Sequence, residues 1–252
     1  MPISSYLKDR QWSKLLEFLR TDPKVKVGNP AKLRIFVEAS FWMLRAGCAW
    51  RLLPREYGHW NTIFKRFNAW SQNGVWIRLF DFSVEEPDLE YVSLDTTIVR
   101  AHACSAGYGK DSQAEEALGR SRGGFSTKIH AKVDALGNPL ELRLTGGNVS
   151  DIKCASDLIE DDIGRKILAD KAFDSNDFLI QGLMNDCEMV VPPKKNRNLQ
   201  REYDEHVYQD RHVIECFFGK IKHFRRVFSR FDKAARNYFS FVCLASTHVW
   251  LR

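Results

Sequence analysis

The stretch YVSLDTT at residues 91–97 decides the fold, because a short apolar run leads directly into the acidic residue Asp95. A second apolar run, within ILADKAF at residues 167–173, ends on Asp170. Both runs have the length and composition of strands, so each carboxylate is expected where a strand meets the edge of a sheet. If the two strands are neighbours, Asp95 and Asp170 lie side by side.

A third acidic residue, Glu215, belongs to the pattern Tyr-x2-Arg-x3-Glu-x6-Lys, which Tyr208, Arg211, Glu215 and Lys222 form. At 100° per residue, these four side chains fall within about 60° of one another on one face of a single predicted helix. The apolar residues of the same segment fall on a different face: Ile214, Phe217, Ile221, Phe224 and Phe228. A solvated face with ordinary ion pairs is the alternative, but the spacing of all four residues favours a functional face.

Two Asp and one Glu form a set of oxygen ligands, which suits Mg²⁺ or Mn²⁺ better than zinc. Two such ions can activate a water molecule and stabilise the leaving oxygen when a phosphodiester is cleaved. We therefore predict that Asp95, Asp170 and Glu215 are both the catalytic and the metal-binding residues. The chain has no glycine-rich phosphate loop of the G-x4-G-K-[ST] type, so no nucleotide cofactor is expected.

These motifs resemble those of the DDE transposases of bacterial insertion sequences, most closely the insertion sequence five family, which is related to the insertion sequence four group. The stretches GRSRGG at residues 119–124 and STKIHA at 126–131 are also similar to that family, and the resemblance extends from about residue 6 to 250. It implies an enzyme that binds the terminal inverted repeats of its element, cleaves DNA and transfers the cut strand into target DNA. Only 45 residues separate Asp170 from Glu215, too few for the strand-rich insertion of some relatives.

The order of predicted elements after residue 90 is three strands, then helix, strand, helix, strand and helix. That order predicts an α/β fold, a ribonuclease H-like mixed sheet with flanking helices, preceded by a small all-helical domain. We expect a helix-turn-helix-like DNA-binding domain over residues 1–83, a linker over 84–90 and the catalytic domain over 91–252. Periodicity alone leaves a plain helical bundle equally possible for the first domain, and the resemblance favours the DNA reader.

A hairpin is predicted around Gly137, because Ile129, Ala131 and Val133 alternate with polar residues and Leu140, Leu142 and Leu144 alternate again. His130 lies on its polar side. It either faces the edge that carries the active site or makes a structural hydrogen bond.

Charge is segregated along the chain, whose net charge is +6. Residues 1–80 contain 14 Lys and Arg against 5 Asp and Glu, residues 81–193 contain 11 against 21, and residues 194–236 contain 12 against 6. An acidic middle flanked by basic segments suits a metal site between surfaces that bind phosphates. The residues predicted to contact DNA are Tyr208, Arg211, Lys222, Arg225, Arg226, Arg45, Arg51, Lys65, Arg66, Arg122 and Lys128.

The six cysteines form no CxxC pair, so we expect reduced and mostly buried thiols, with Cys216 as a small core residue. No apolar run approaches the roughly 20 residues that span a bilayer, and no signal-peptide core is present. The expected location is the bacterial cytoplasm, in association with the nucleoid.

Double-stranded DNA, as element ends and as target, is the expected partner, and a homodimer assembled on DNA is expected because one chain carries one triad. Two other functions are open: a structure-selective nuclease of the same fold, and an inactive or domesticated descendant that only binds DNA. Inverted repeats flanking the gene would favour the mobile element.

Overall fold

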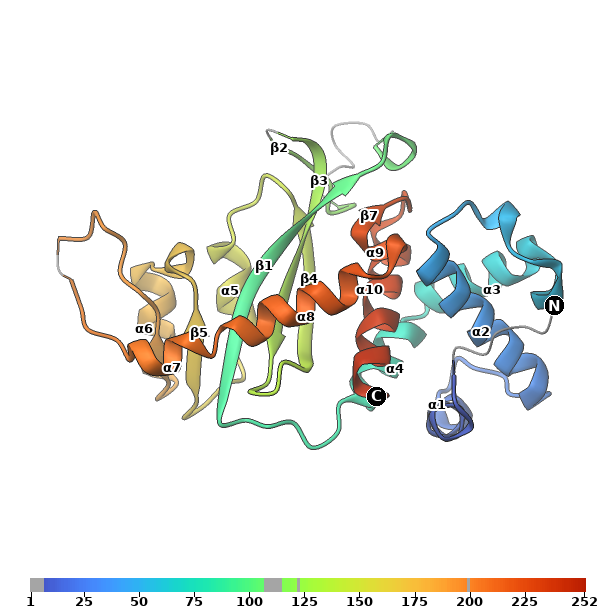
Figure 1. The fold of residues 1–252 in the computed structure, drawn as a ribbon, viewed down its shortest axis with the longest axis horizontal. Helices are drawn as coiled ribbons and strands as arrows, with labels where there is room; N and C mark the ends of the chain where they lie inside the picture. Colours follow the sequence, from blue (N-terminus) through green and yellow to red (C-terminus); the bar gives the residue numbers. More distant parts are fainter. Residues whose placement is uncertain (1–6, 107–114, 122, 199) are drawn as a thin grey trace. The chain divides into compact units, whose positions relative to one another are not determined.

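The computed structural model describes residues 7–106, 115–121, 123–198 and 200–252 (Figure 1). The chain forms two compact units: residues 86–101 with 108–220, and residues 1–85 with 102–107 and 221–252. The sequence predicts one catalytic domain over 91–252, whereas residues 221–252 cluster with the N-terminal helices.

The first unit is built on a mixed sheet whose central strand carries Asp95. Strand β1 pairs antiparallel with β3 and parallel with β5, in the order β2-β3-β1-β5-β6, and β4 also pairs with β3. The prediction of a mixed sheet with flanking helices is confirmed. Its strands are β1 (Tyr91–Ala101), β2 (Gly119–Ser121), β3 (Gly124–Val133), β4 (Pro139–Gly146), β5 (Lys166–Ala169) and β6 (Glu188–Val190).

The register between β1 and β5 places the two aspartates. Leu94 pairs with Ala169 in the parallel ladder, and each is followed directly by an aspartate, Asp95 within β1 and Asp170 just after β5. The predicted neighbour relation of the two carboxylates is therefore confirmed by the pairing of the strands that carry them.

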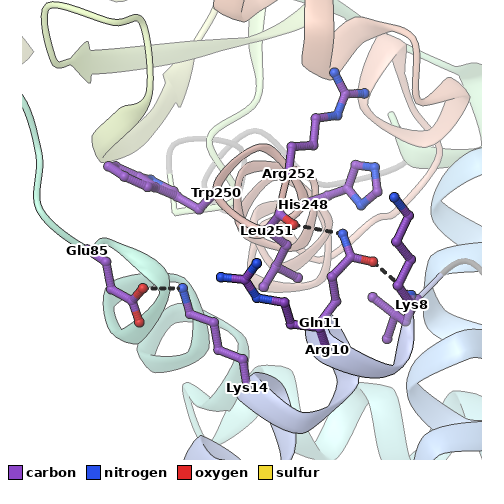
Figure 2. Close-up of a pocket in the computed structure, with 10 residues that line it drawn as sticks. Lys8, Arg10, Gln11, Lys14, Glu85, His248, Trp250, Leu251 and Arg252 are labelled. Carbon is purple, nitrogen blue, oxygen red and sulfur yellow. Dashed lines mark hydrogen bonds and ion pairs between the residues drawn. The ribbon is translucent and has the colours of Figure 1, made fainter.

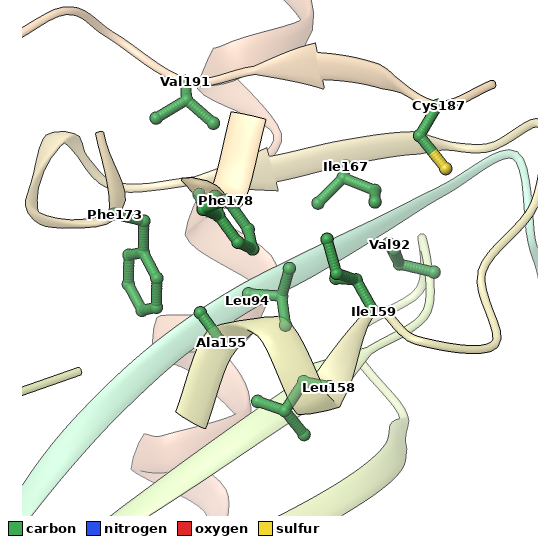
Figure 3. Packing of buried hydrophobic residues seen from close by; sticks show 11 residues of the cluster. Val92, Leu94, Ala155, Leu158, Ile159, Ile167, Phe173, Phe178, Cys187 and Val191 are labelled. Carbon is green, nitrogen blue, oxygen red and sulfur yellow. The ribbon is translucent and has the colours of Figure 1, made fainter. Parts of the chain in front are cut away.

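One face of the sheet is covered by helices α5 (Ile152–Leu158) and α6 (Asn176–Met184). Figure 3 shows Val92 and Leu94 of β1 packed in an apolar cluster with residues of these helices. Because side chains alternate along a strand, Asp95 points to the opposite face from Leu94. This alternation keeps the carboxylate out of the apolar layer.

The hairpin of β3 and β4 differs from its prediction, because its polar side is also buried. Lys128, His130 and Lys132 are at most 8 % exposed. The Lys128 ammonium lies 2.8 Å from an Asp151 oxygen, and that of Lys132 lies 3.0 Å from an Asp162 oxygen. Carboxylates from the next segment of chain, which alternation cannot reveal, make burial of these lysines possible.

The second unit is mainly helical, in line with the helices expected in the N-terminal part of the chain. It contains α1 (Asp9–Thr21), α2 (Pro30–Ala46), α3 (Trp60–Gln72), α4 (Val75–Ser83), α9 (Arg225–Phe228) and α10 (Ala235–Trp250). Short 3-10 turns and one short strand complete it: η1 (Trp50–Leu52), η2 (Arg55–Tyr57), η3 (Ala103–Ser105) and β7 (Ser229–Arg230). Asn29 caps α2 by accepting the Lys32 N–H at 3.1 Å, and Gly47, at φ +62°, ends it.

Aromatic rings dominate the core of this unit. The rings of Phe67 and Phe241 stack at 4.4 Å, and Trp76 is fully buried beside them. Phe241 belongs to the apolar stretch 239–245, which lies within α10 and is almost entirely buried. No helix among the described residues is long and apolar enough to cross a membrane.

A buried ion pair fixes the chain between α9 and α10. The Arg226 guanidinium donates to both oxygens of Asp232, at 3.0 and 2.8 Å, and to the Cys48 carbonyl at 2.6 Å. It also lies 4.8 Å from the centre of the Phe241 ring. Because Arg226 is 3 % exposed, the prediction that it extends a basic surface toward DNA is wrong.

Replacing Asp232 with Ala is expected to lower the free energy of unfolding by about 3–5 kcal/mol, because Arg226 would remain buried without its partner. Urea denaturation measures this. Asp9→Ala is the matched control, since Asp9 pairs with Arg34 at 2.7 Å but its side chain is 92 % exposed; its cost should be below about 1 kcal/mol. Equal losses for the two variants would contradict the structural role of Arg226.

Candidate active site

Asp95 is the most deeply placed carboxylate of the predicted triad, with a side chain 22 % exposed. Its Oδ1 accepts the Thr96 N–H at 2.7 Å and its Oδ2 accepts from Arg211 at 2.9 Å. Burial raises the pKa of Asp95, and the charge of Asp170 raises it further, while the two donors only partly oppose this. The surroundings of Asp95 therefore disfavour its charged form, mainly because the carboxylate is buried.

Asp170 follows β5 directly and begins the 3-10 turn η5 (Lys171–Phe173). One carboxylate oxygen accepts the Ala172 N–H at 3.2 Å. The turn fixes the backbone of Asp170, and the residue stays partly exposed to solvent.

The segment that carries Glu215 is not one helix, which corrects the prediction. Helix α7 (Glu205–Gln209) contains Tyr208, and α8 (His212–Lys222) contains Glu215. Between them, the amides of Asp210 and Arg211 bond to carbonyls three residues back, at 3.0 and 3.1 Å, so the chain tightens and leaves the α-helical path. Of the predicted apolar stripe, Phe228 is 65 % exposed and lies in α9.

Arg211 consequently lies in the turn and bridges two carboxylates. One terminal nitrogen is 2.9 Å from Asp95 Oδ2 and the other is 2.6 Å from Glu215 Oε1. Its side chain is 15 % exposed, and the Tyr208 ring lies 5.8 Å from its guanidinium carbon. Burial opposes the charge of Arg211, but Asp95, Tyr208 and Glu215 outweigh it and raise the pKa of the guanidinium.

The carboxylates satisfy the chemistry of a divalent-metal site but are not gathered around one point. Among the described residues, no three His, Cys, Asp or Glu side chains are grouped closely enough to hold one metal ion. Arg211 instead bridges Asp95 and Glu215. Burial, and to a smaller extent the nearby Asp170, disfavours the charged form of Asp95, and a hard cation at this site would offset both effects.

The other residues predicted to contact DNA are spread over different surroundings. Lys222 ends α8 half-buried, with its pKa lowered by burial, and Arg225 is exposed at the start of α9. Arg45, Arg51 and Lys65 are exposed, whereas Arg122 lies outside the described residues.

Two further predicted DNA contacts need correction. Lys128 is 8 % exposed and is occupied by Asp151 and by the Val149 carbonyl at 2.7 Å. Arg66 does not point outward, because its guanidinium stacks over Phe36 at 4.6 Å, and burial lowers its pKa. Both side chains serve packing in this structure.

Cys216, next to Glu215, is exposed, so the prediction of a small core residue is wrong. Cys154, Cys187 and Cys243 are buried, Cys48 is partly buried and Cys104 is exposed, so half of the six thiols are buried where most were expected to be. Burial raises the pKa of Cys154 to about 11, which keeps that thiol protonated and unreactive near neutral pH.

Asp174 is an organising residue that the sequence does not reveal. Its side chain is fully buried and accepts from the Lys194 N–H at 2.8 Å, from Arg197 at 2.7 Å and from Arg201 at 2.9 Å. These bonds hold the segment that contains Lys194, Arg197 and Arg201, which follows β6, against the end of η5. The partners are 20–27 residues from Asp174, so no local pattern could identify them.

His130 makes the structural hydrogen bonds that were one of its two predicted roles. Its Nδ1 lies 2.9 Å from Thr96 Oγ1 and its Nε2 lies 2.7 Å from Thr145 Oγ1, so it links β1, β3 and β4. Burial lowers the pKa of His130 to about 4. The neutral ring thus ties the residue after Asp95 into the sheet.

The fold and site describe an α/β protein with Asp95 inside the central strand and Asp170 directly after the neighbouring strand. Comparisons with known proteins agree with an insertion-sequence transposase. The family of putative transposases of the IS4/5 group matches residues 7–80, and the transposase DDE domain family matches residues 87–247. The chain therefore belongs to the transposase DDE domain family.

Individual relatives are similar over shorter stretches. A putative transposase for insertion sequence element IS6501 of Brucella ovis is 37 % identical over 132 residues, covering 51 % of this chain and all of that protein. The uncharacterized protein y4sN of Sinorhizobium fredii is 37 % identical over 101 residues, covering 40 % of this chain and 81 % of its own length. A piggyBac transposase in a synaptic complex with hairpin DNA has a TM-score of 0.41 at 10 % identity; the match covers 77 % of this chain and half of that one.

The lowered pKa of His130 predicts a specific pH dependence. Between pH 6.5 and about 4 the unfolded chain binds a proton that the folded chain does not, so stability should fall by about 2–4 kcal/mol as pH drops through this window. His130→Gln should lower stability at pH 7 but remove this part of the pH dependence in urea titrations. The exposed His223→Gln should leave the pH dependence intact; an unchanged slope in His130→Gln would refute the assignment.

Proposed function

We propose that the chain is the active transposase of an insertion sequence, which binds the terminal inverted repeats, cleaves DNA phosphodiesters and joins the ends to target DNA. The observation that carries this proposal is the pairing of β1 with β5, which sets Asp95 beside Asp170, together with the Arg211 bridge to Glu215. Family membership supports the reaction class.

The sheet is proposed to be ribonuclease H-like. Three features support this assignment: the central position of β1, the antiparallel strands β3 and β4, of which β3 pairs with β1 and β4 with β3, and the parallel strands β5 and β6. The N-terminal helices are proposed to form a helix-turn-helix-like domain that binds DNA, with Arg45, Arg51 and Lys65 as exposed candidates for phosphate contact.

Asp95, Asp170 and Glu215 are proposed to hold two divalent ions, Mg²⁺ or Mn²⁺, which supply Lewis-acid activation of the attacking and leaving oxygens. In this structure the positive charge of Arg211 lies between the carboxylates of Asp95 and Glu215 and offsets their negative charge. Arg211 bonds one oxygen of each of these carboxylates, so a cation that used the same oxygens would compete with it. A guanidinium displaced in this way would be available to a DNA phosphate, to which its planar fork is well suited.

Contacts to DNA near the cut are proposed for Tyr208, Lys222 and Arg225. Lys222 is seven residues after Glu215, so helix periodicity sets it on the same side of α8, roughly 10 Å further along the axis. Because two element ends must be joined to one target and each chain carries one triad, the working assembly is proposed to be a homodimer on double-stranded DNA.

Asp95→Asn, Asp170→Asn and Glu215→Gln should each lower end cleavage in Mg²⁺ by a factor on the order of 10³ or more, because each removes an anionic ligand worth several kcal/mol in the transition state. Binding of a terminal-repeat duplex should change little. Asp177→Asn, an exposed acid of the same unit, is the matched control. A variant that cleaves at the control's rate would remove that residue from the triad.

Arg211→Ala should raise the affinity of the DNA-free chain for Mn²⁺ by about tenfold or more, because a cation that competes for Asp95 and Glu215 is lost. Titration calorimetry, or the electron paramagnetic resonance of free Mn²⁺, reports this without any DNA. Lys153→Ala removes an exposed charge of the same unit as control. Equal or weaker Mn²⁺ binding by Arg211→Ala would show that the guanidinium does not compete with the metal.

A further inference from the structure

A cavity of about 820 Å³ lies in the helical unit, where the start of α1 meets the end of α10 (Figure 2). In Figure 2 the side chains of Lys8, Arg10 and Lys14 project from α1 toward the end of α10. Arg252 adds a fourth cationic side chain to the lining. None of these four residues is among those predicted from the sequence to contact DNA.

Negative charge in the lining is small and already engaged. Glu85 is the one acidic side chain among the described lining residues, and it pairs with Lys14 at 2.7 Å. Arg10 and Lys8 are exposed, and no described carboxylate pairs with either. The cavity therefore keeps a net positive charge that nothing in the described chain neutralises.

The walls of this cavity are held in place. Gln11 donates to the Leu251 carbonyl at 2.8 Å and accepts the Lys8 N–H at 2.8 Å, which ties α1 to the end of α10. His248 lines the cavity, and its Nδ1 is buried without a hydrogen-bond partner among the described residues. Burial lowers the pKa of His248, and the positive charges of Arg252 and Arg45 lower it further, which reports the cationic surroundings.

The size and layout of the charges indicate which anion fits. Arg10 and Lys14 are four residues apart on one face of α1, so the cations are strung along a helix instead of converging on one point. Such a row suits an extended polyanion better than a single small anion. The indole of Trp250 adds an aromatic wall, which nucleic-acid surfaces commonly combine with basic residues.

We propose that this cavity, lined by Lys8, Arg10, Lys14 and Arg252, is a DNA-backbone contact surface of the helical unit. The inference rests on the proposed function, because DNA is the polyanion on which a transposase acts. It names a phosphate-binding surface distinct from the triad. Contacts of this kind position DNA without reading its sequence.

The test is fluorescence anisotropy of the full chain with a labelled duplex of arbitrary sequence, repeated over a range of salt concentrations. The double variant Lys8→Ala with Arg10→Ala should reduce the slope of log affinity against log salt by about two. Glu85→Gln should raise affinity and steepen the slope by about one, because it releases Lys14. Thermal melting by circular dichroism checks that each variant is folded.

The matched control is Lys26→Ala with Lys32→Ala, two exposed lysines of the same unit outside the cavity. A smaller slope for the cavity variant alone, with a gain in Glu85→Gln, supports the proposal. An unchanged cavity variant, or an equal loss in the control, overturns it while leaving the transposase proposal standing. If the unaltered chain shows no salt-dependent DNA binding, both fail.

Discussion

The parallel pairing of β1 with β5 is the constraint on which the site depends. β1 is paired on both sides, with β3 from Ser93 to Arg100 and with β5 from Tyr91 to Leu94, so its register is fixed twice. A slip of one residue would turn Asp95 into the apolar layer and bring Leu94 to the site face. The position of the first carboxylate is thus secured by the burial of Val92 and Leu94 under α5 and α6.

Buried charge recurs in both units, and each time the chain supplies a partner. Lys128 and Lys132 are matched by Asp151 and Asp162, and Asp174 by Arg197 and Arg201. The proposed site differs in one respect. Asp95 has a partner in Arg211, but burial still raises its pKa, and Asp170 adds a smaller contribution in the same direction. A divalent cation at this site would oppose both effects.

The sequence predicted those parts of the structure that depend on local patterns. Helical periodicity indicated a helical N-terminal part of the chain, and the apolar runs before Asp95 and Asp170 identified β1 and β5. The break before Arg211 was missed because an ideal helix was assumed between Tyr208 and Lys222, and turn formation depends on amide bonding that spacing does not encode. The burial of Lys128 and Arg226 was missed because their acidic partners cannot be assigned from sequence alone.

The central claim is that Asp95, Asp170 and Glu215 bind the same metal ions, and iron-directed cleavage of the protein tests it most directly. Fe²⁺ can replace Mg²⁺ at oxygen sites, and with ascorbate and peroxide it cuts the backbone next to its ligands. The cleavage is performed on the chain bound to DNA. The expected fragments end near residues 95, 170 and 215, and they disappear when excess Mg²⁺ is added. Cuts confined to other segments, or cuts that excess Mg²⁺ leaves unchanged, would contradict it.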